Sequence, residues 1–275
     1  MSEDTSVRLS RPRIIALRVA VVIFLVVGLA GLGPALVLPF IAWLPEESLI
    51  EFGLPEDDIG HLIHGVGVGL VYGALLLSVA VQLRRPQRWV APLWLAMFLL
   101  GAQACYDLAR LTIDDPTWLV VYGLFAAVVM LHPRRLARIS AVDRPTLILA
   151  VAAAAPLGVF AWQRLELQIG PPDPFGHAAD NHYYGMAALA AVVIVAALLG
   201  STDLPGWRLA AWVAGVAAAL FGIASLVHPT QESALASPWA AAAIVWAAVY
   251  LAMVWLRGRR SRVPSADAQA ASSGV

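Results

Sequence analysis

The sequence predicts an all-α, polytopic membrane protein with about eight transmembrane helices. Hydrophobic residues make up 60% of the 275 residues and charged residues only 13%. Apolar windows about 20 residues long, sufficient to cross a bilayer as a helix, recur along the whole chain. Soluble domains are nearer ~45–50% apolar and about 25% charged, so the mean hydropathy of +0.77 excludes a cytosolic enzyme, a nucleic-acid-binding protein and a disordered chain. The expected partner is the lipid bilayer.

Each predicted span is an apolar window bounded by Arg, Pro, Asp or Glu. The eight spans are 14–33, 60–83, 89–111, 117–132, 145–163, 182–200, 207–228 and 238–256. The first span follows Arg8, Arg11 and Arg13, which resemble the basic start of a signal peptide. Its apolar run is too long for a signal peptide and no small-x-small cleavage site follows, so we predict a transmembrane helix.

The distribution of arginine predicts the orientation. All 18 basic residues are Arg, because the sequence contains no Lys. With the N-terminus in the cytoplasm, every Arg except Arg110 and Arg164 falls on the cytoplasmic side, which agrees with the positive-inside rule. Both termini are therefore expected in the cytoplasm. Rich in Ala and Arg and free of Lys, the chain is expected in the plasma membrane of a prokaryote, its cytoplasmic membrane.

The order of the spans suggests two halves. The expected segments are a cytoplasmic N-terminal segment (1–13), a first four-helix half (14–133), a cytoplasmic linker (134–144), a second four-helix half (145–256) and a disordered basic cytoplasmic tail (257–275). The connection 34–59 is too apolar for a solvated loop, so we expect it to lie in the membrane interface or to fold over the bundle.

A shift of 121 residues supports an internal repeat, because it aligns His61 with His182 and Asp107 with His228. Few other positions of the two aligned segments are identical, and segments so rich in Ala and Leu share some identical positions by chance. Eight helices without a duplication therefore stay open as the alternative.

Histidines gather at the outer face. Five of the six His residues fall there, and in the repeat hypothesis the pairs His61/Asp107 and His182/His228 converge around a pseudo-twofold axis. Three imidazoles and one carboxylate suit Zn²⁺ or another divalent metal. The predicted metal ligands are His61, Asp107, His182 and His228. The residues expected to support or replace them are His64, His177, Gln103, Arg110, Asp180, Asn181 and Ser225.

The favoured function is an outward-facing metal site that hydrolyses a membrane-associated substrate, with the catalytic residues unassigned. One alternative is a haem or quinone redox protein, in which His64 and His182 ligate haem b. The other is a non-catalytic scaffold, sensor or transporter, although no charged residue lies near the middle of a span. The single Cys105 excludes an intrachain disulfide and a CxxC metal site.

Two known families are similar in outline. Two four-helix units resemble the haem A synthases, but the His placement differs and their Glu-x-x-His-Arg type signature is absent. Zinc-dependent hydrolases of the ceramidase and adiponectin-receptor class also combine His with Asp, but this chain lacks their His-x-x-x-His helix. The sequence is therefore assigned to neither family.

Overall fold

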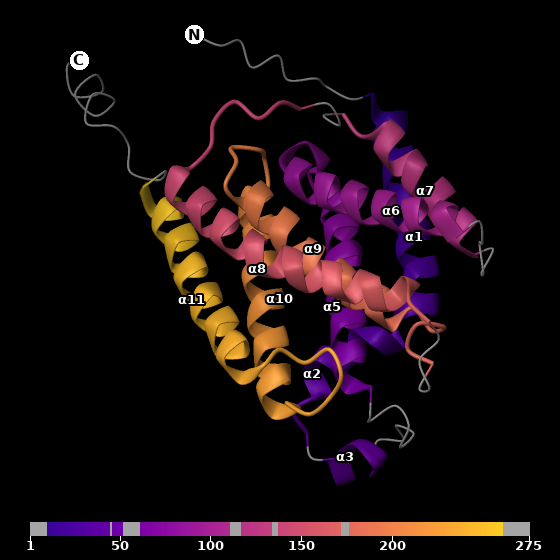
Figure 1. The fold of residues 1–275 in the computed structure, drawn as a ribbon. Helices are drawn as coiled ribbons and strands as arrows, with labels where there is room; N and C mark the ends of the chain where they lie inside the picture. Colours follow the sequence, from indigo (N-terminus) through magenta and orange to yellow (C-terminus); the bar gives the residue numbers. More distant parts are fainter. Residues whose placement is uncertain are drawn as a thin grey trace.

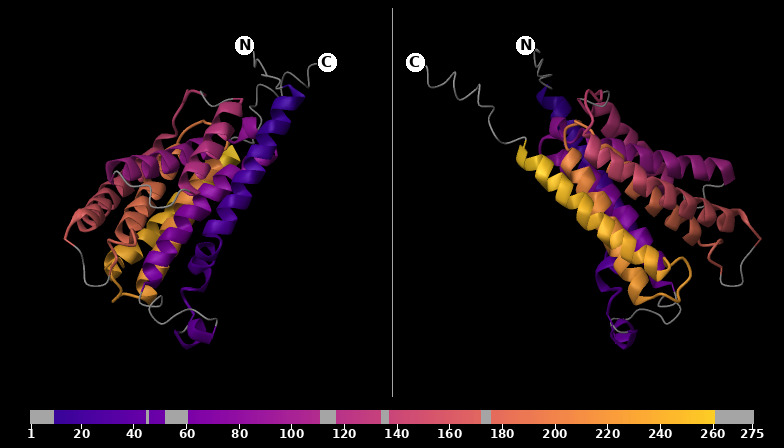
Figure 2. Two further views of the ribbon diagram at one scale, coloured as in Figure 1. Left: turned by 90° about the vertical axis from the view of Figure 1, so that its right-hand side faces the viewer. Right: turned by 60° about the vertical axis from the view of Figure 1, so that its left-hand side comes forward.

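The described residues of the protein form a helical bundle. A computed structural model describes residues 10–44, 46–51, 61–110, 117–133, 137–171 and 176–260. The long helices are α1 (Arg11–Leu32), α5 (Leu62–Ala80), α6 (Val90–Arg110), α7 (Thr117–Leu131), α8 (Arg144–Ile169), α9 (His182–Gly200), α10 (Trp207–Val227) and α11 (Ser237–Arg260). The short elements are η1 (Pro34–Leu36), α2 (Leu38–Ile41), α3 (Glu46–Glu51), η2 (Val81–Leu83) and η3 (Pro86–Arg88). Figures 1 and 2 show one bundle, in which α6 and α8 are inclined to α5, α10 and α11.

The all-helical membrane class is confirmed. Within the described residues, seven helices are long and apolar enough to cross a membrane, and α7 is a shorter apolar helix of 15 residues. At 1.5 Å per residue, α7 is about 22 Å long, less than the ~30 Å of a hydrocarbon core. The predicted number of eight crossings therefore stays a prediction. The predicted segments 1–13 and 257–275 lie largely outside the described residues.

Three helices form the centre of the bundle. The apolar windows of α9, α10 and α5 are buried over 61%, 56% and 50% of their residues, whereas that of α8 is buried over only 11%. Exposed side chains of α8 such as Ile148 and Trp162 are apolar, as expected of a helix that faces lipid. The helix α8 is also longer than its predicted span of 145–163, and it contains Pro156 in its interior.

At one end of the bundle, which we call the arginine end, backbone carbonyls accept hydrogen bonds from Arg13, Arg18, Arg208 and Arg257. Arg13 donates hydrogen bonds to the carbonyls of Met130 and Leu131 at the end of α7, and Arg18 donates to Leu83 at the end of η2. The last carbonyls of a helix lack partners within the helix, and a cation there also interacts favourably with the helix dipole. The arginines therefore fasten neighbouring helices at their C-terminal ends.

Arg257 makes the most contacts of this kind. Its Nη1 donates to the carbonyl of Gly200 (2.9 Å) and its Nη2 to that of Thr202 (2.7 Å), both at the end of α9. The guanidinium also stacks on Trp207, with Cζ 3.8 Å from the ring centroid, and Nε lies 4.0 Å from Asp143. One side chain thus joins α8, α9, α10 and α11.

Replacing Arg257 with leucine is expected to destabilise the protein by about 2–4 kcal/mol, because two carbonyls lose their donors and the stacking on Trp207 is lost. Thermal unfolding in detergent micelles measures the change. Arg260, which is exposed in the same last turn, provides the control, and its replacement with leucine should change stability by less than about 0.5 kcal/mol. Equal effects of the two substitutions would contradict this role for Arg257.

The connection after α1 folds against the bundle, as expected. The short helices η1 and α2 pack on α5, and Ala42 and Leu49 are buried. The close approach occurs at Gly69 of α5, where a Cβ atom would lie 2.6 and 2.8 Å from ring atoms of Pro39 and would collide with the carbonyl oxygen of Ala35. Residues 52–60 of this connection lie outside the described residues.

The packing also bears on the repeat. The helix α5 packs on α9 and α10, and α9 packs on α5 and α6. In the predicted repeat, α5 corresponds to α9 and α6 corresponds to α10. The contact between α5 and α10 then corresponds to the contact between α9 and α6. However, α10 packs along α11 much more extensively than α6 packs along α7. The internal repeat stays a prediction.

Candidate metal centre

Imidazole rings from three elements meet at the end of the bundle opposite the arginine end. We call this the histidine end and define it by His61, His64, His177 and His182. His61 is the N-cap residue of α5, and His64 lies in the first turn of that helix. His182 is the first residue of α9, and His177 lies in the turn before it. The N-terminal ends of α5 and α9 therefore supply three of the four rings.

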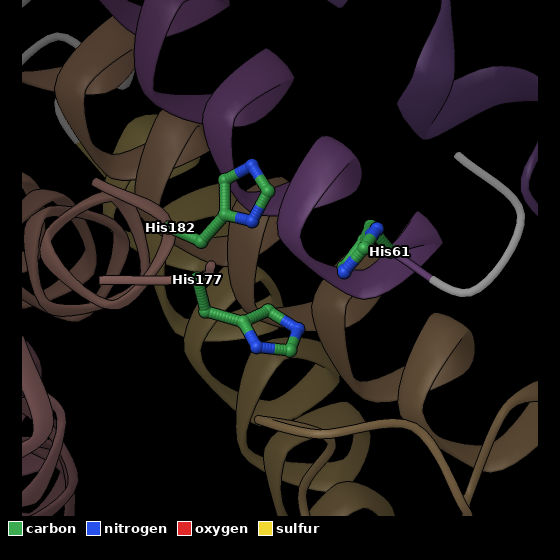
Figure 3. Close-up of side chains that lie close together, drawn as sticks. All are labelled: His61, His177 and His182. Carbon is green, nitrogen blue, oxygen red and sulfur yellow. The ribbon is translucent and has the colours of Figure 1, made fainter. Parts of the chain in front are cut away.

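Three of these histidines lie close enough together to hold one metal ion after small movements. One nitrogen each from His61, His177 and His182 lies within 4.8 Å of the other two (Figure 3). The ring centroids of His61 lie 4.6 Å from His177 and 5.3 Å from His182. Nitrogens bound to one tetrahedral Zn²⁺ at 2.0–2.1 Å lie roughly 3.3 Å apart. Movements of about 1 Å would therefore bring the three rings to a common ion.

The turn that carries His177 is fixed by backbone and side-chain hydrogen bonds. Gly176 has a φ of +78°, a conformation that glycine adopts at no steric cost. The buried Gln168 of α8 donates through Nε2 to the carbonyl of Ala178 (2.6 Å) and accepts through Oε1 from the amide of Tyr184 (3.0 Å). The amide of His182 donates to the carbonyl of His177 (2.9 Å). The positions of His177 and His182 are therefore coupled.

The loop between α10 and α11 contacts the start of α5, the start of α9 and His177. Gln231 accepts a hydrogen bond from the amide of Ile63 at the start of α5 (3.0 Å). Glu232 accepts from the hydroxyl of Tyr183 (2.6 Å), and its other carboxylate oxygen lies 3.4 Å from Nδ1 of His177. A carboxylate that receives the N–H of an imidazole fixes the orientation of that ring, as in many metal sites. Glu232 can thus hold His177 in position for an ion.

His64 packs against the other three rings and is only 1% exposed. Its ring centroid lies 5.0 Å from both His177 and His182, and its Nε2 forms a 3.0 Å hydrogen bond with Oγ of Ser233. The Nδ1 atom of His64 is buried and makes no hydrogen bond to the described residues. Ser233 has a φ of +68°, which is rare outside glycine. Backbone conformations of this kind often occur at functional sites.

The structure places two of the predicted ligands elsewhere. Asp107 accepts hydrogen bonds from Gln103 Nε2 (2.9 Å) and from the Tyr122 hydroxyl (2.6 Å). His228 donates from Nε2 to the carbonyl of Ala42. Asp107 and His182 line a common cavity of about 600 Å³, but Asp107 and His228 are not members of the histidine group that has metal-site spacing. Of the four predicted ligands, the structure brings together His61 and His182.

The residues predicted to support the site have different roles. His177 is one of the three grouped histidines, and His64 lies against them. Arg110 donates to Asn181 Oδ1, which also accepts from the Tyr106 hydroxyl (2.7 Å). These contacts join the end of α6 to the start of α9. Asp180 is exposed in the turn between His177 and His182. Ser225 accepts a 3.1 Å hydrogen bond from the amide of Leu235 and so holds the α10–α11 loop.

The geometry does not fit a haem between His64 and His182. Axial ligands of one haem approach the iron from opposite faces of the porphyrin. The rings of His64 and His182 instead lie stacked, with an interplanar angle of 19° and centroids 5.0 Å apart. A porphyrin has no room between two rings in this arrangement.

Sequence reasoning missed the residues of the α10–α11 loop and Arg164. Gln231, Glu232 and Ser233 are consecutive polar residues on the predicted outer side, which was the available signal. Their pairing with His177 and His64 depends on the path of the loop. Arg164 donates from Nη1 to Ser233 Oγ (3.1 Å), and its position as one of two arginines at the outer face was the signal for it.

Comparison of the chain with protein-family models, with curated proteins and with solved structures found no match.

Proposed function

We propose that this protein is an integral membrane metalloprotein in which His61, His177 and His182 bind a divalent cation, with Zn²⁺ as the favoured ion. The observation that carries the proposal is the set of three imidazole nitrogens within 4.8 Å of one another. Neutral imidazoles bind Zn²⁺ well, and three protein ligands are typical of catalytic zinc sites. Glu232 beside His177 supplies the supporting carboxylate.

The proposed reaction is hydrolysis of a membrane-associated substrate. His61, His177 and His182 would hold the ion, which would supply Lewis-acid activation of a water near neutral pH, the chemistry needed to hydrolyse an ester, amide or phosphate. His61 and His182 are each partly exposed, so a substrate can approach these rings. The centre lies at one end of the helices, and its proposed depth in the bilayer is therefore the level of the lipid headgroups.

The proposed topology has eight crossings and both termini in the cytoplasm. The hydrogen bonds of Arg13, Arg18 and Arg257 collect the start of α1 and the ends of α5, α7, α9 and α11 at one end of the bundle. The positive-inside rule then favours the cytoplasm for the arginine end. The histidine end accordingly faces the outside of a prokaryotic plasma membrane.

Metal analysis of the full chain, purified in detergent without chelators, tests this function. Wild-type protein is expected to contain about one zinc ion per chain, and the His61→Ala/His182→Ala double variant is expected to contain almost none. Inductively coupled plasma mass spectrometry measures both, and circular dichroism checks that the variant is folded.

Two further variants separate the ligand set in the structure from the set predicted by the sequence. His228→Gln and Asp107→Asn are expected to retain the metal, because neither residue belongs to the grouped histidines. Loss of metal from both would instead support the predicted set. A wild-type protein without any metal would overturn the proposed function.

A further inference from the structure

A second cavity lies beside the histidine end, between α8, α9, α10 and α11. Its volume is about 630 Å³. Leu157, Phe160, Leu189, Val193 and Phe221 are among the apolar side chains that line it, and Trp239 and Trp246 of α11 line it as well. Most of its wall is therefore suited to hydrocarbon rather than to a polar solute.

The cavity opens where α8 and α11 diverge. At the arginine end these two helices are joined by the ion pair of Arg257 with Asp143. Further from that end, Trp246 Nε1 of α11 donates a 2.9 Å hydrogen bond to the carbonyl of Leu149 in α8. Figure 1 shows the two helices separating from there toward their other ends. Val159 and Trp239 line the cavity and are 59% and 60% exposed. In a bilayer, this side of the cavity faces lipid.

Of the described residues that line this apolar cavity, one is a cation, Arg164, and it lies at the histidine end. Arg164 donates from Nη1 to Ser233 Oγ, and its Cζ lies 5.2 Å from the ring centroid of Phe160. Its Nε atom is buried and makes no hydrogen bond to the described residues. A buried guanidinium donor without an acceptor is costly, and an anionic oxygen is the acceptor that such a donor binds best.

We infer that this cavity binds an anionic lipid, with an acyl chain between α8 and α11 and the anionic headgroup at Arg164. The lining residues run from Ala152 to Arg164 along α8, a distance of about 18 Å at 1.5 Å per residue. That length lies in the membrane, with the cation at its outer edge. Apolar walls below a single cation match a lipid in both charge and depth.

The position of Arg164 also connects this lipid with the histidines. Ser233 Oγ accepts from Arg164 and forms a hydrogen bond with His64. A headgroup at Arg164 would therefore be connected to the ring of His64 through Ser233. A role for this lipid as the substrate of the metal centre rests on the proposed function, whereas its binding does not.

Native mass spectrometry of the full chain in detergent tests the lipid site. The probes are phosphatidylglycerol and phosphatidylcholine with identical acyl chains. Wild-type protein is expected to retain phosphatidylglycerol about tenfold better, and Arg164→Gln is expected to lose this preference. Arg110→Gln, at the other outward arginine, should keep it. Equal retention of the two lipids by wild-type protein, or an unchanged preference in Arg164→Gln, would overturn the lipid site.

The lining residue Ala242 provides a test of the acyl-chain position. Ala242→Phe narrows the cavity and is expected to reduce phosphatidylglycerol retention several-fold. Ala241→Phe is the control, because Ala241 is also exposed but is not among the lining residues. If Ala242→Phe has no effect and inorganic phosphate displaces the lipid, Arg164 binds a free anion and the inference is wrong.

Metal analysis of the same samples separates this inference from the proposed function. Arg164→Gln should retain its zinc, so that lost lipid cannot be ascribed to a collapsed metal centre. Wild-type protein that prefers phosphatidylglycerol but contains no metal would support the lipid site and overturn only the metal function. Metal-containing protein without a lipid preference would do the reverse.

Discussion

Zinc at one hundred times its dissociation constant is expected to raise the free energy of unfolding of the wild-type protein by about 2.7 kcal/mol. The His177→Ala variant should gain no such stabilisation. A ligand that binds only the folded state stabilises it by mass action, and the three donor histidines lie close together only when α5, α9 and the turn before α9 are in place. Thermal or denaturant unfolding in detergent, with and without zinc, measures the difference.

Glu232→Gln is the informative second variant in this experiment. It keeps the size of the side chain but removes the carboxylate 3.4 Å from His177 Nδ1, and it is expected to weaken zinc binding about 10- to 100-fold. Protons compete with the metal for imidazole nitrogens, so the stabilisation by zinc should also decline as the pH is lowered. Equal stabilisation of wild type and His177→Ala would show that zinc binds elsewhere.

Gly69→Ala is expected to destabilise the protein by about 1–2 kcal/mol. The added methyl group would collide with the carbonyl oxygen of Ala35 and with the ring of Pro39. Backbone and proline ring atoms cannot move aside as a flexible side chain does, and overpacking of this kind typically costs about 1–3 kcal/mol. Alanine favours a helix over glycine by about 1 kcal/mol, which offsets only part of this cost.

Gly73, one turn further along the same helix, is the matched control. A Cβ at Gly73 would lie 3.8 Å from Leu36, which is an ordinary van der Waals contact. Gly73→Ala should therefore leave stability unchanged or raise it by up to about 1 kcal/mol. Thermal unfolding of both variants in the same detergent measures the contrast. Similar melting temperatures for the two variants would mean that the segment containing Ala35 and Pro39 does not pack on α5 in solution.

The helices could be predicted because crossing a bilayer imposes a length and a composition on each segment. The predicted spans 182–200 and 207–228 agree closely with α9 and α10. The end of α8 could not be predicted, because the helix continues past Arg164 to Ile169 through residues that read as an outer connection. Hydropathy alone does not show that Gln168 is buried against the turn of His177.

The structure brings together two of the four ligands that the sequence predicts, His61 and His182. His61 and His182 were identified from their place at the start of two spans, and these rings do meet. Asp107 was predicted as a ligand from the 121-residue offset. This offset gives the position of a residue along its helix but not the direction in which its side chain points. Tyr122 of the next helix, α7, donates a hydrogen bond from its hydroxyl to the Asp107 carboxylate. His228 likewise meets the carbonyl of Ala42, whose position depends on how the connection after α1 folds.

The separation of the three histidines along the chain has a consequence for biogenesis. His61 leaves the ribosome 116 residues before His177 and 121 before His182, so the helices α6, α7 and α8 are synthesised before the second half of the cluster exists. A nascent chain that ends with α8, at Ile169, carries only one of the three histidines. Capture of a metal at the proposed site would therefore have to follow synthesis of α8 and the start of α9, and it would mark the molecules that have passed that point.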